Sequence, residues 1–177
     1  MTSLTQTASS DPLIRAAGGF AIVSGIISAI GVVCLFVMFI LFATPFRELG
    51  LTFGLLNDIC GALQYLLTIP IAIALYRILL SYNPRWIRGA TIVGIASMLT
   101  VVVLQLALIF KLMTIQQQGL WVALAIFVGV GAWLLITGLV ARSTGRLPNS
   151  VMMSSIAVPY VGYPIWAFWL GLLLLRW

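Results

Sequence analysis

The sequence predicts an all-α membrane protein, a bundle of five transmembrane helices. Of its 177 residues, 63% are hydrophobic and only 7% are charged, whereas a typical soluble domain carries roughly 25% charged residues. The hydrophobic residues fall in long runs, and a helix needs about 20 of them to cross the hydrocarbon core of a bilayer. We therefore expect a single membrane domain over residues 1–177, with short loops and no soluble domain.

Each expected helix is a long apolar run bounded by charged or turn residues. Residues 1–15 come first, are polar at their start and rich in Ser and Thr, and are expected to form a flexible tail. The spans are then expected at residues 18–43, 53–76, 89–110, 120–141 and 151–175. Proline, asparagine, glycine and glutamine mark the loops between them, as is usual for turns and interfacial segments.

The basic residues predict the orientation, because Lys and Arg concentrate on the cytoplasmic side of a membrane. Five spans divide the nine basic residues into six on the N-terminal side and three on the other. The six are Arg15, Arg77, Arg85, Arg88, Arg142 and Arg146, and the three are Arg47, Lys111 and Arg176. We expect a multi-pass protein of the plasma membrane with its N-terminus in the cytoplasm and its C-terminus outside. Scattered single charges at span ends do not form a nucleic-acid patch.

Asp58 is the only acidic residue inside any of the five runs. A charge in a membrane span is costly, and polar side chains there turn toward the interior of the bundle. Its neighbours at helical spacing form a candidate polar site that comprises Asn57, Asp58, Gln64, Tyr65 and Thr68. Two interpretations stay open. Asp58 is either a proton or cation site, or a structural group that caps the helix or pairs with Arg47 or Lys111.

The last run contains two prolines and a glycine, Pro159, Gly162 and Pro164. Proline removes a backbone donor, so this pattern predicts a bent or broken helix at mid-membrane. Broken helices line ligand sites in some transporters. The nearby aromatic residues form a candidate lipid or ligand site, namely Tyr160, Tyr163, Trp166 and Trp169. The alternative is a kinked helix whose aromatic side chains pack against neighbouring helices.

Several chemistries are excluded by composition. The chain has no histidine, which rules out His-ligated haem, a His-based triad and His-containing metal sites. Three acidic residues are too few for a two-metal centre. Cys34 and Cys60 do not form a vicinal pair, so thiol redox chemistry is not indicated. We expect no enzymatic activity, no cofactor and no bound metal.

Two stretches in the first 80 residues resemble a known family. They are Arg15-Ala16-Ala17-Gly18-Gly19 before a long span, and the run from Leu55-Leu56-Asn57-Asp58 to Ala74-Leu75-Tyr76-Arg77. Together they resemble a family of small bacterial membrane proteins of unknown function, the DUF4386 type. The resemblance implies an architecture and a bacterial origin. It implies no activity and no site residues.

The short loops and missing catalytic groups favour a non-catalytic membrane protein. We expect an accessory subunit of a membrane complex, or a homo-oligomer that acts by helix packing. Its expected partners are the lipid bilayer and other membrane subunits or itself, and no nucleic acid. One alternative is a small transporter or channel that uses Asp58 and the broken last span. A second is a lipid- or quinone-binding protein that uses the aromatic segment.

Overall fold

The computed structural model describes residues 11–144 and 162–176, and these residues are helical with no strand. The helices are α1 (Pro12–Phe42), α2 (Arg47–Leu79), α3 (Pro84–Ile109), α4 (Ile115–Leu124), the π-helical turn η2 (Ala125–Val130), α5 (Gly131–Thr144) and α7 (Gly162–Leu175). The predicted all-α class is confirmed. Helices α4, η2 and α5 follow one another without a break and form one continuous rod.

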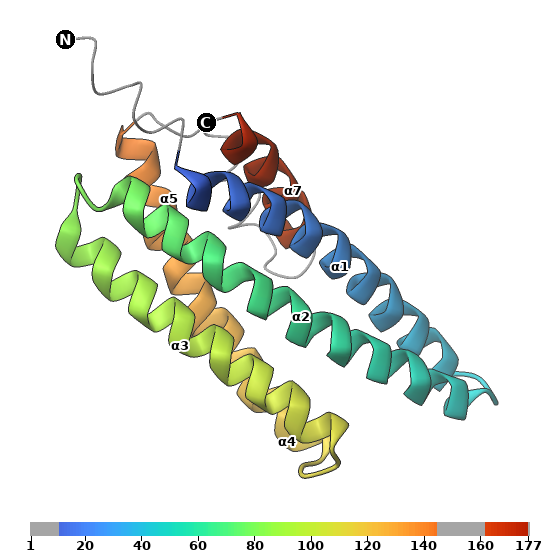
Figure 1. Ribbon diagram of the computed structural model, residues 1–177. Coiled ribbons are helices and arrows are strands. Elements are labelled where there is room, and N and C mark those ends of the chain that lie inside the picture. Colours follow the sequence, from blue (N-terminus) through green and yellow to red (C-terminus); the bar gives the residue numbers. More distant parts are fainter. Residues whose placement is uncertain (1–10, 145–161, 177) are drawn as a thin grey trace.

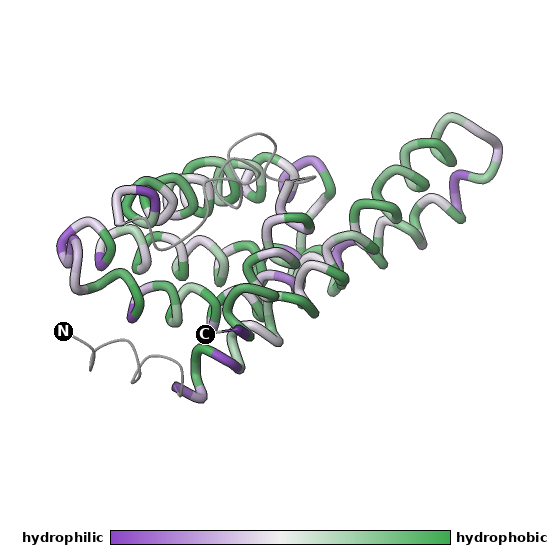
Figure 2. Tube along the Cα trace, turned by 90° about the horizontal axis from the view of Figure 1, so that it is seen from above, coloured by the Kyte–Doolittle hydropathy of each residue, from purple (hydrophilic) through white to green (hydrophobic). Residues whose placement is uncertain are grey.

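Four of these elements are long and apolar enough to cross a membrane: α1, α2, α3 and the rod over Ile115–Thr144. Hydrophilic residues gather at the turns, and the helices between them are mostly hydrophobic (Figure 2). The fifth predicted span differs. Its described part is α7, of 14 residues, which at about 1.5 Å per residue covers roughly 21 Å of a hydrocarbon core about 30 Å thick. Residues 151–161 of that predicted span lie outside the described residues.

All four long helices begin earlier than expected, and at two of these starts a side chain caps the helix. The Asp11 carboxylate accepts a hydrogen bond from the backbone N–H of Leu13 at 2.9 Å. As a result α1 begins at Pro12, and the end of the predicted tail is helical. Thr114 and Gln117 form a reciprocal capping box at the start of α4. Such caps satisfy the free N–H groups of a first turn, so the glutamines predicted as loop belong to a helix.

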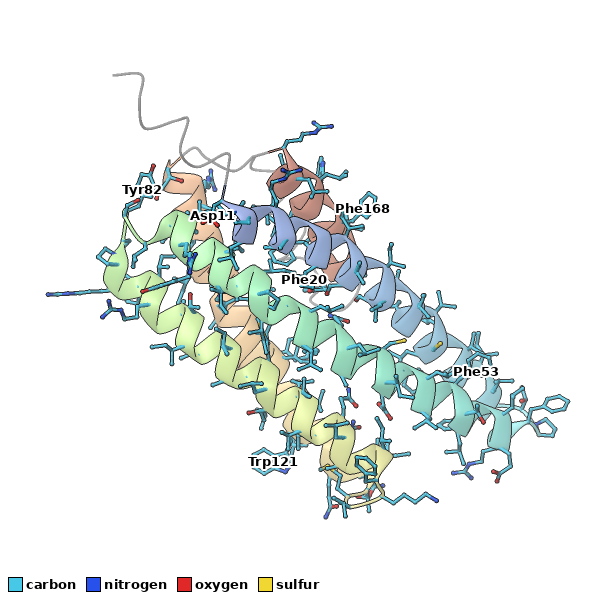
Figure 3. All side chains as sticks on the ribbon, viewed as in Figure 1. Asp11, Phe20, Phe53, Tyr82, Trp121 and Phe168 are labelled. Carbon is cyan, nitrogen blue, oxygen red and sulfur yellow. The ribbon has the colours of Figure 1, made fainter. Side chains whose placement is uncertain are left out.

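The helices form two antiparallel hairpins, α1–α2 and α3 with the rod, and α2 packs against α3 (Figure 1). We call the end where α1 begins the N-terminal end of the bundle and the opposite end the far end. At the far end the two hairpins separate into a fork. Phe53 on α2 and Trp121 on α4 lie on its two arms (Figure 3).

Helix α7 packs on the outside of α1 and runs antiparallel to it. A Cβ on Gly18 would lie 3.0 Å from Cγ of Leu175, and a Cβ on Gly25 would lie 3.0 Å from the carbonyl oxygen of Pro164. The end of α7 therefore lies beside the start of α1, as Figure 1 also shows. Among the described residues, the start of α1 and the end of α7 thus lie at the same end of the bundle, whereas five full spans would place them at opposite ends.

This arrangement moves Arg176 to the N-terminal end. Of the basic residues that the structure describes, six now lie at that end, namely Arg15, Arg77, Arg85, Arg88, Arg142 and Arg176. Arg47 and Lys111 lie at the far end, in or beside the turns of the two hairpins. The charge asymmetry along the bundle is therefore larger than the one expected from five full spans.

Glycines and a serine bring the helices close together. Gly94 of α3 faces Trp133 of α5, which is fully buried, and a Cβ on Gly94 would lie 2.6 Å from Cγ of that indole. Gly129 in η2 faces Ser97 of α3 in the same way. Close backbone approach at small residues is how helices associate where lipid gives no hydrophobic drive.

Candidate functional site

The polar residues of α2 lie on its inner face. Gln64, Tyr65 and Thr68 are buried, and Asn57 and Asp58 are half-buried. Together with side chains from other helices they form two polar clusters. One consists of hydroxyl groups near the middle of the bundle, and the other consists of amide groups around Asp58 toward the far end.

The hydroxyl cluster joins three helices. The Tyr163 hydroxyl of α7 lies 2.8 Å from Ser24 Oγ of α1 and also contacts Thr68 Oγ1 of α2. Ser24 and Thr68 each donate to the carbonyl oxygen of Gln64, at 3.3 Å and 2.7 Å. The cluster thus has three hydroxyl protons for four contacts. With Ser24 and Thr68 donating to the Gln64 carbonyl, the Tyr163 hydroxyl donates to either Ser24 or Thr68. The cluster fixes α7 against the α1–α2 hairpin.

The amide cluster surrounds Asp58. Gln118 Nε2 of α4 donates to Gln105 Oε1 of α3, and the Asp58 carboxylate forms hydrogen bonds with the side chains of Gln118 and Asn57. Gly61 makes room for this arrangement, because a Cβ there would lie 3.0 Å from Gln105 Nε2. The carboxylate is therefore held by neutral amide groups.

The structure does not give Asp58 the cationic partner that one interpretation expected. Among the described residues, the ion pair joins Arg77 to Asp11 at 3.8 Å, on the N-terminal side. Arg47 instead places its guanidinium carbon 6.0 Å from the centre of the Phe42 ring. Lys111 is exposed in the turn between α3 and α4, with a φ of 58°. Asp58 is thus a carboxylate without a counter-ion in the described part of the chain.

A small cavity lies between the two clusters. It has a volume of about 20 Å³, enough for roughly one water molecule. Its lining residues come from three helices and are Ser28, Gly31, Val32, Asn57, Gly61, Gln64, Tyr65 and Gln105. Polar groups therefore follow one another from Asp58 to Tyr163. Beyond Tyr163, toward the N-terminal end, the core consists of fully buried aliphatic side chains such as Ile71, Leu79 and Leu174.

The aromatic residues of the last run do not form one site. Tyr163 and Trp166 are buried, with ring centres 5.5 Å apart, and Trp166 meets Trp133 edge to face. Trp169 lies on the outer face, where it lines an apolar groove between α1 and α7. Tyr160 lies outside the described residues. The buried rings therefore pack helices together, and only Trp169 of the described aromatic set faces outward.

Sequence reasoning missed Ser24 and Gln118. A serine in a long apolar run was the available signal for the first. The pattern Thr114-x-x-Gln117 before an apolar stretch was the signal for the second, because it predicts a helix start and so places Gln118 on a helix. Among the residues that the structure describes, no group of three potential metal-ligating side chains occurs.

No family model matches the chain, and no curated protein or solved structure is significantly similar to it. The resemblance of the first 80 residues to the DUF4386 type stays a prediction.

Proposed function

We propose that the protein is a non-catalytic, multi-pass protein of the plasma membrane, which acts as a subunit of a membrane complex or as a homo-oligomer. Four long apolar helices support the membrane placement. So does the face of α1 over residues 20–40, whose exposed large residues are all apolar: Phe20, Val23, Ile26, Ile30, Val33, Phe36, Phe39 and Ile40. A soluble protein rarely exposes so large an apolar surface.

The charge asymmetry supports an orientation with the N-terminal end in the cytoplasm. Six of the eight described basic residues lie at that end, and cytoplasmic loops are enriched in Lys and Arg. Because α7 returns to the same end, the proposal places both chain ends in the cytoplasm. It counts four full spans and one half-length helix.

The main support for a function as a subunit is that Asp58 has no counter-ion among the described residues. A carboxylate at membrane depth is costly, and such groups pair with cations wherever the structure supplies one. Here the described partners are neutral amides. A Lys or Arg from a second polypeptide, or from a second copy, would complete the site.

Native mass spectrometry after gentle extraction from the source membrane tests this function. The wild type is expected to stay in a fixed complex with another polypeptide or with itself. Asp58→Asn keeps the shape of the side chain and one acceptor oxygen but removes its charge, so it should release the partner. Glu48→Gln is the matched control, because Glu48 is an exposed acid in the first turn of the same helix. A lone wild-type protomer would contradict the proposal.

The polar cavity favours a second candidate, a small proton or cation transporter. Asp58 would bind the ion, and Asn57, Gln64 and Ser28 would line its way to Tyr163. The aliphatic core beyond Tyr163 requires a second conformation that opens this route. Flux into proteoliposomes tests the candidate: Asp58→Asn should abolish transport and leave the thermal stability in detergent close to that of the wild type. A wild type without flux eliminates it.

A further inference from the structure

A groove between α3 and α5 opens at the N-terminal end of the bundle. It has a volume of about 570 Å³. Arg85 and Trp86 lie at its mouth, at the start of α3. Gly89, Ala132 and Ile136 line the part that runs deeper between the two helices. The groove therefore has one charged end and an otherwise mostly apolar wall.

Among the described residues, no acidic side chain pairs with the charge at the mouth. The whole chain has three acidic residues. Asp11 pairs with Arg77, Asp58 lies in the amide cluster, and Glu48 begins α2 at the far end. Arg85 and its neighbour Arg88 are both exposed at the end of the bundle that already holds most of the positive charge. An external anion fits this position better than any group of the chain.

Small residues make the apolar part of the groove wide enough for a chain molecule. A Cβ on Gly89 would meet no atom within 4 Å, so the wall is open there. Trp86 is 64% exposed, as expected for an aromatic ring at the level of lipid headgroups. Basic pockets between transmembrane helices on the cytoplasmic side bind anionic lipid headgroups, and a guanidinium pairs well with a phosphate.

We propose that this groove binds an anionic phospholipid, with the phosphate at Arg85 and one acyl chain along Gly89, Ala132 and Ile136. The inference rests on the membrane placement proposed above and is independent of the partner at Asp58. Unlike the general attraction of a basic surface to lipid, this binding involves one groove that holds one lipid molecule.

Native mass spectrometry of the full chain in mild detergent tests the site, with phosphatidylglycerol and phosphatidylcholine as the added lipids. The wild type is expected to retain one phosphatidylglycerol in preference to phosphatidylcholine. Arg85→Gln should weaken that binding about fivefold, the effect of removing one basic residue near an anionic lipid. Arg15→Gln is the matched control, since Arg15 is exposed at the same end on α1 and does not line the groove.

A second variant tests the acyl-chain part. Gly89→Leu adds a side chain to the groove wall at a position whose Cβ would meet no atom within 4 Å, and it should remove the bound lipid. Gly119→Leu is its control, because Gly119 is equally open but lies on α4 at the far end. Equal retention of both lipids, equal losses in Arg85→Gln and Arg15→Gln, or full binding by Gly89→Leu would each overturn the proposal. A dimer that only Gly89→Leu dissociates would also overturn it, since a second copy would then fill the groove.

Discussion

Helices α3 and α5 pack closely where Gly94, which has only a hydrogen atom as its side chain, contacts Trp133. Gly94→Ala is expected to destabilise the protein by about 1–3 kcal/mol, the usual cost of an overpacked core. The new methyl group would lie 2.6 Å from the indole, which is fully buried. Gly89→Ala in the same helix meets no atom within 4 Å and should be neutral or slightly stabilising. Thermal unfolding of both variants in detergent checks the difference, and equal melting temperatures would contradict it.

The Tyr163 hydroxyl is the group that joins α7 to the α1–α2 hairpin by hydrogen bonds. Tyr163→Phe is expected to cost about 1 kcal/mol, the size of an interhelical hydrogen bond in a membrane protein. The loss is modest because Ser24 and Thr68 keep the Gln64 carbonyl as their acceptor. Thr100→Val is the control, since its hydroxyl bonds only to Ala96 of its own helix on an exposed face. Melting temperatures in detergent compare them, and a Tyr163→Phe variant as stable as Thr100→Val would show that the cluster adds nothing.

At the scale of single residues, the sequence predicted which polar side chains of α2 face the interior of the bundle. It did not predict which groups they contact. The spacing of Gln64 and Thr68 gives their shared face from helix geometry alone. The contact of Thr68 with Tyr163 joins residues 95 positions apart, and no local pattern encodes such a pairing. The expected ion pair of Asp58 is absent among the described residues for a related reason. The sequence shows the charged residues directly. It shows Gln118 beside the carboxylate only if the capped start of α4 is recognised.

Helix α7 packs on α1 through close backbone contacts, one of which is at Gly171. A Cβ on Gly171 would lie 2.8 Å from the carbonyl oxygen of Gly18 and 2.6 Å from Cγ1 of Ile22. Gly171→Leu is therefore expected to push α7 off α1 and to destabilise the packing by about 2 kcal/mol or more. Hydrogen exchange measures the effect, with faster exchange of the amides of α7 than in the wild type.

A matched control separates this clash from the effect of a larger apolar surface. Gly19 lies next to Gly18, and a Cβ there would meet no atom within 4 Å. Gly19→Leu should leave the exchange of α7 unchanged. If both variants loosen α7 to the same extent, the proposed backbone contact does not hold the helix.

Hydropathy predicted the four long helices well because length and apolarity are the quantities that it measures. The last run is apolar over its whole length, and its described part, Gly162–Leu175, is helical. Residues 151–161 of the predicted span lie outside the described residues, so a full crossing by the last run stays a prediction.

At the scale of the whole molecule, the number of membrane crossings, even or odd, determines on which side of the membrane the C-terminus lies. In the proposed topology, four full spans and a returning α7 place it on the same side as the N-terminus. A green fluorescent protein fused after residue 177 is expected to fluoresce in a bacterial host, and alkaline phosphatase at the same position is expected to be inactive. Phosphatase inserted in the turn between α1 and α2, at residues 43–46, should be active and serves as the control. Active phosphatase at the C-terminus would restore the five-span topology.

The order of synthesis determines when the hydroxyl cluster is complete. Ribosomes make α1 before α7, at residues 162–175. Until α7 is synthesised, the Ser24 and Thr68 hydroxyls have the Gln64 carbonyl as their acceptor but lack the Tyr163 hydroxyl. The hydroxyl cluster is thus completed only after α1 and α2 have already been made.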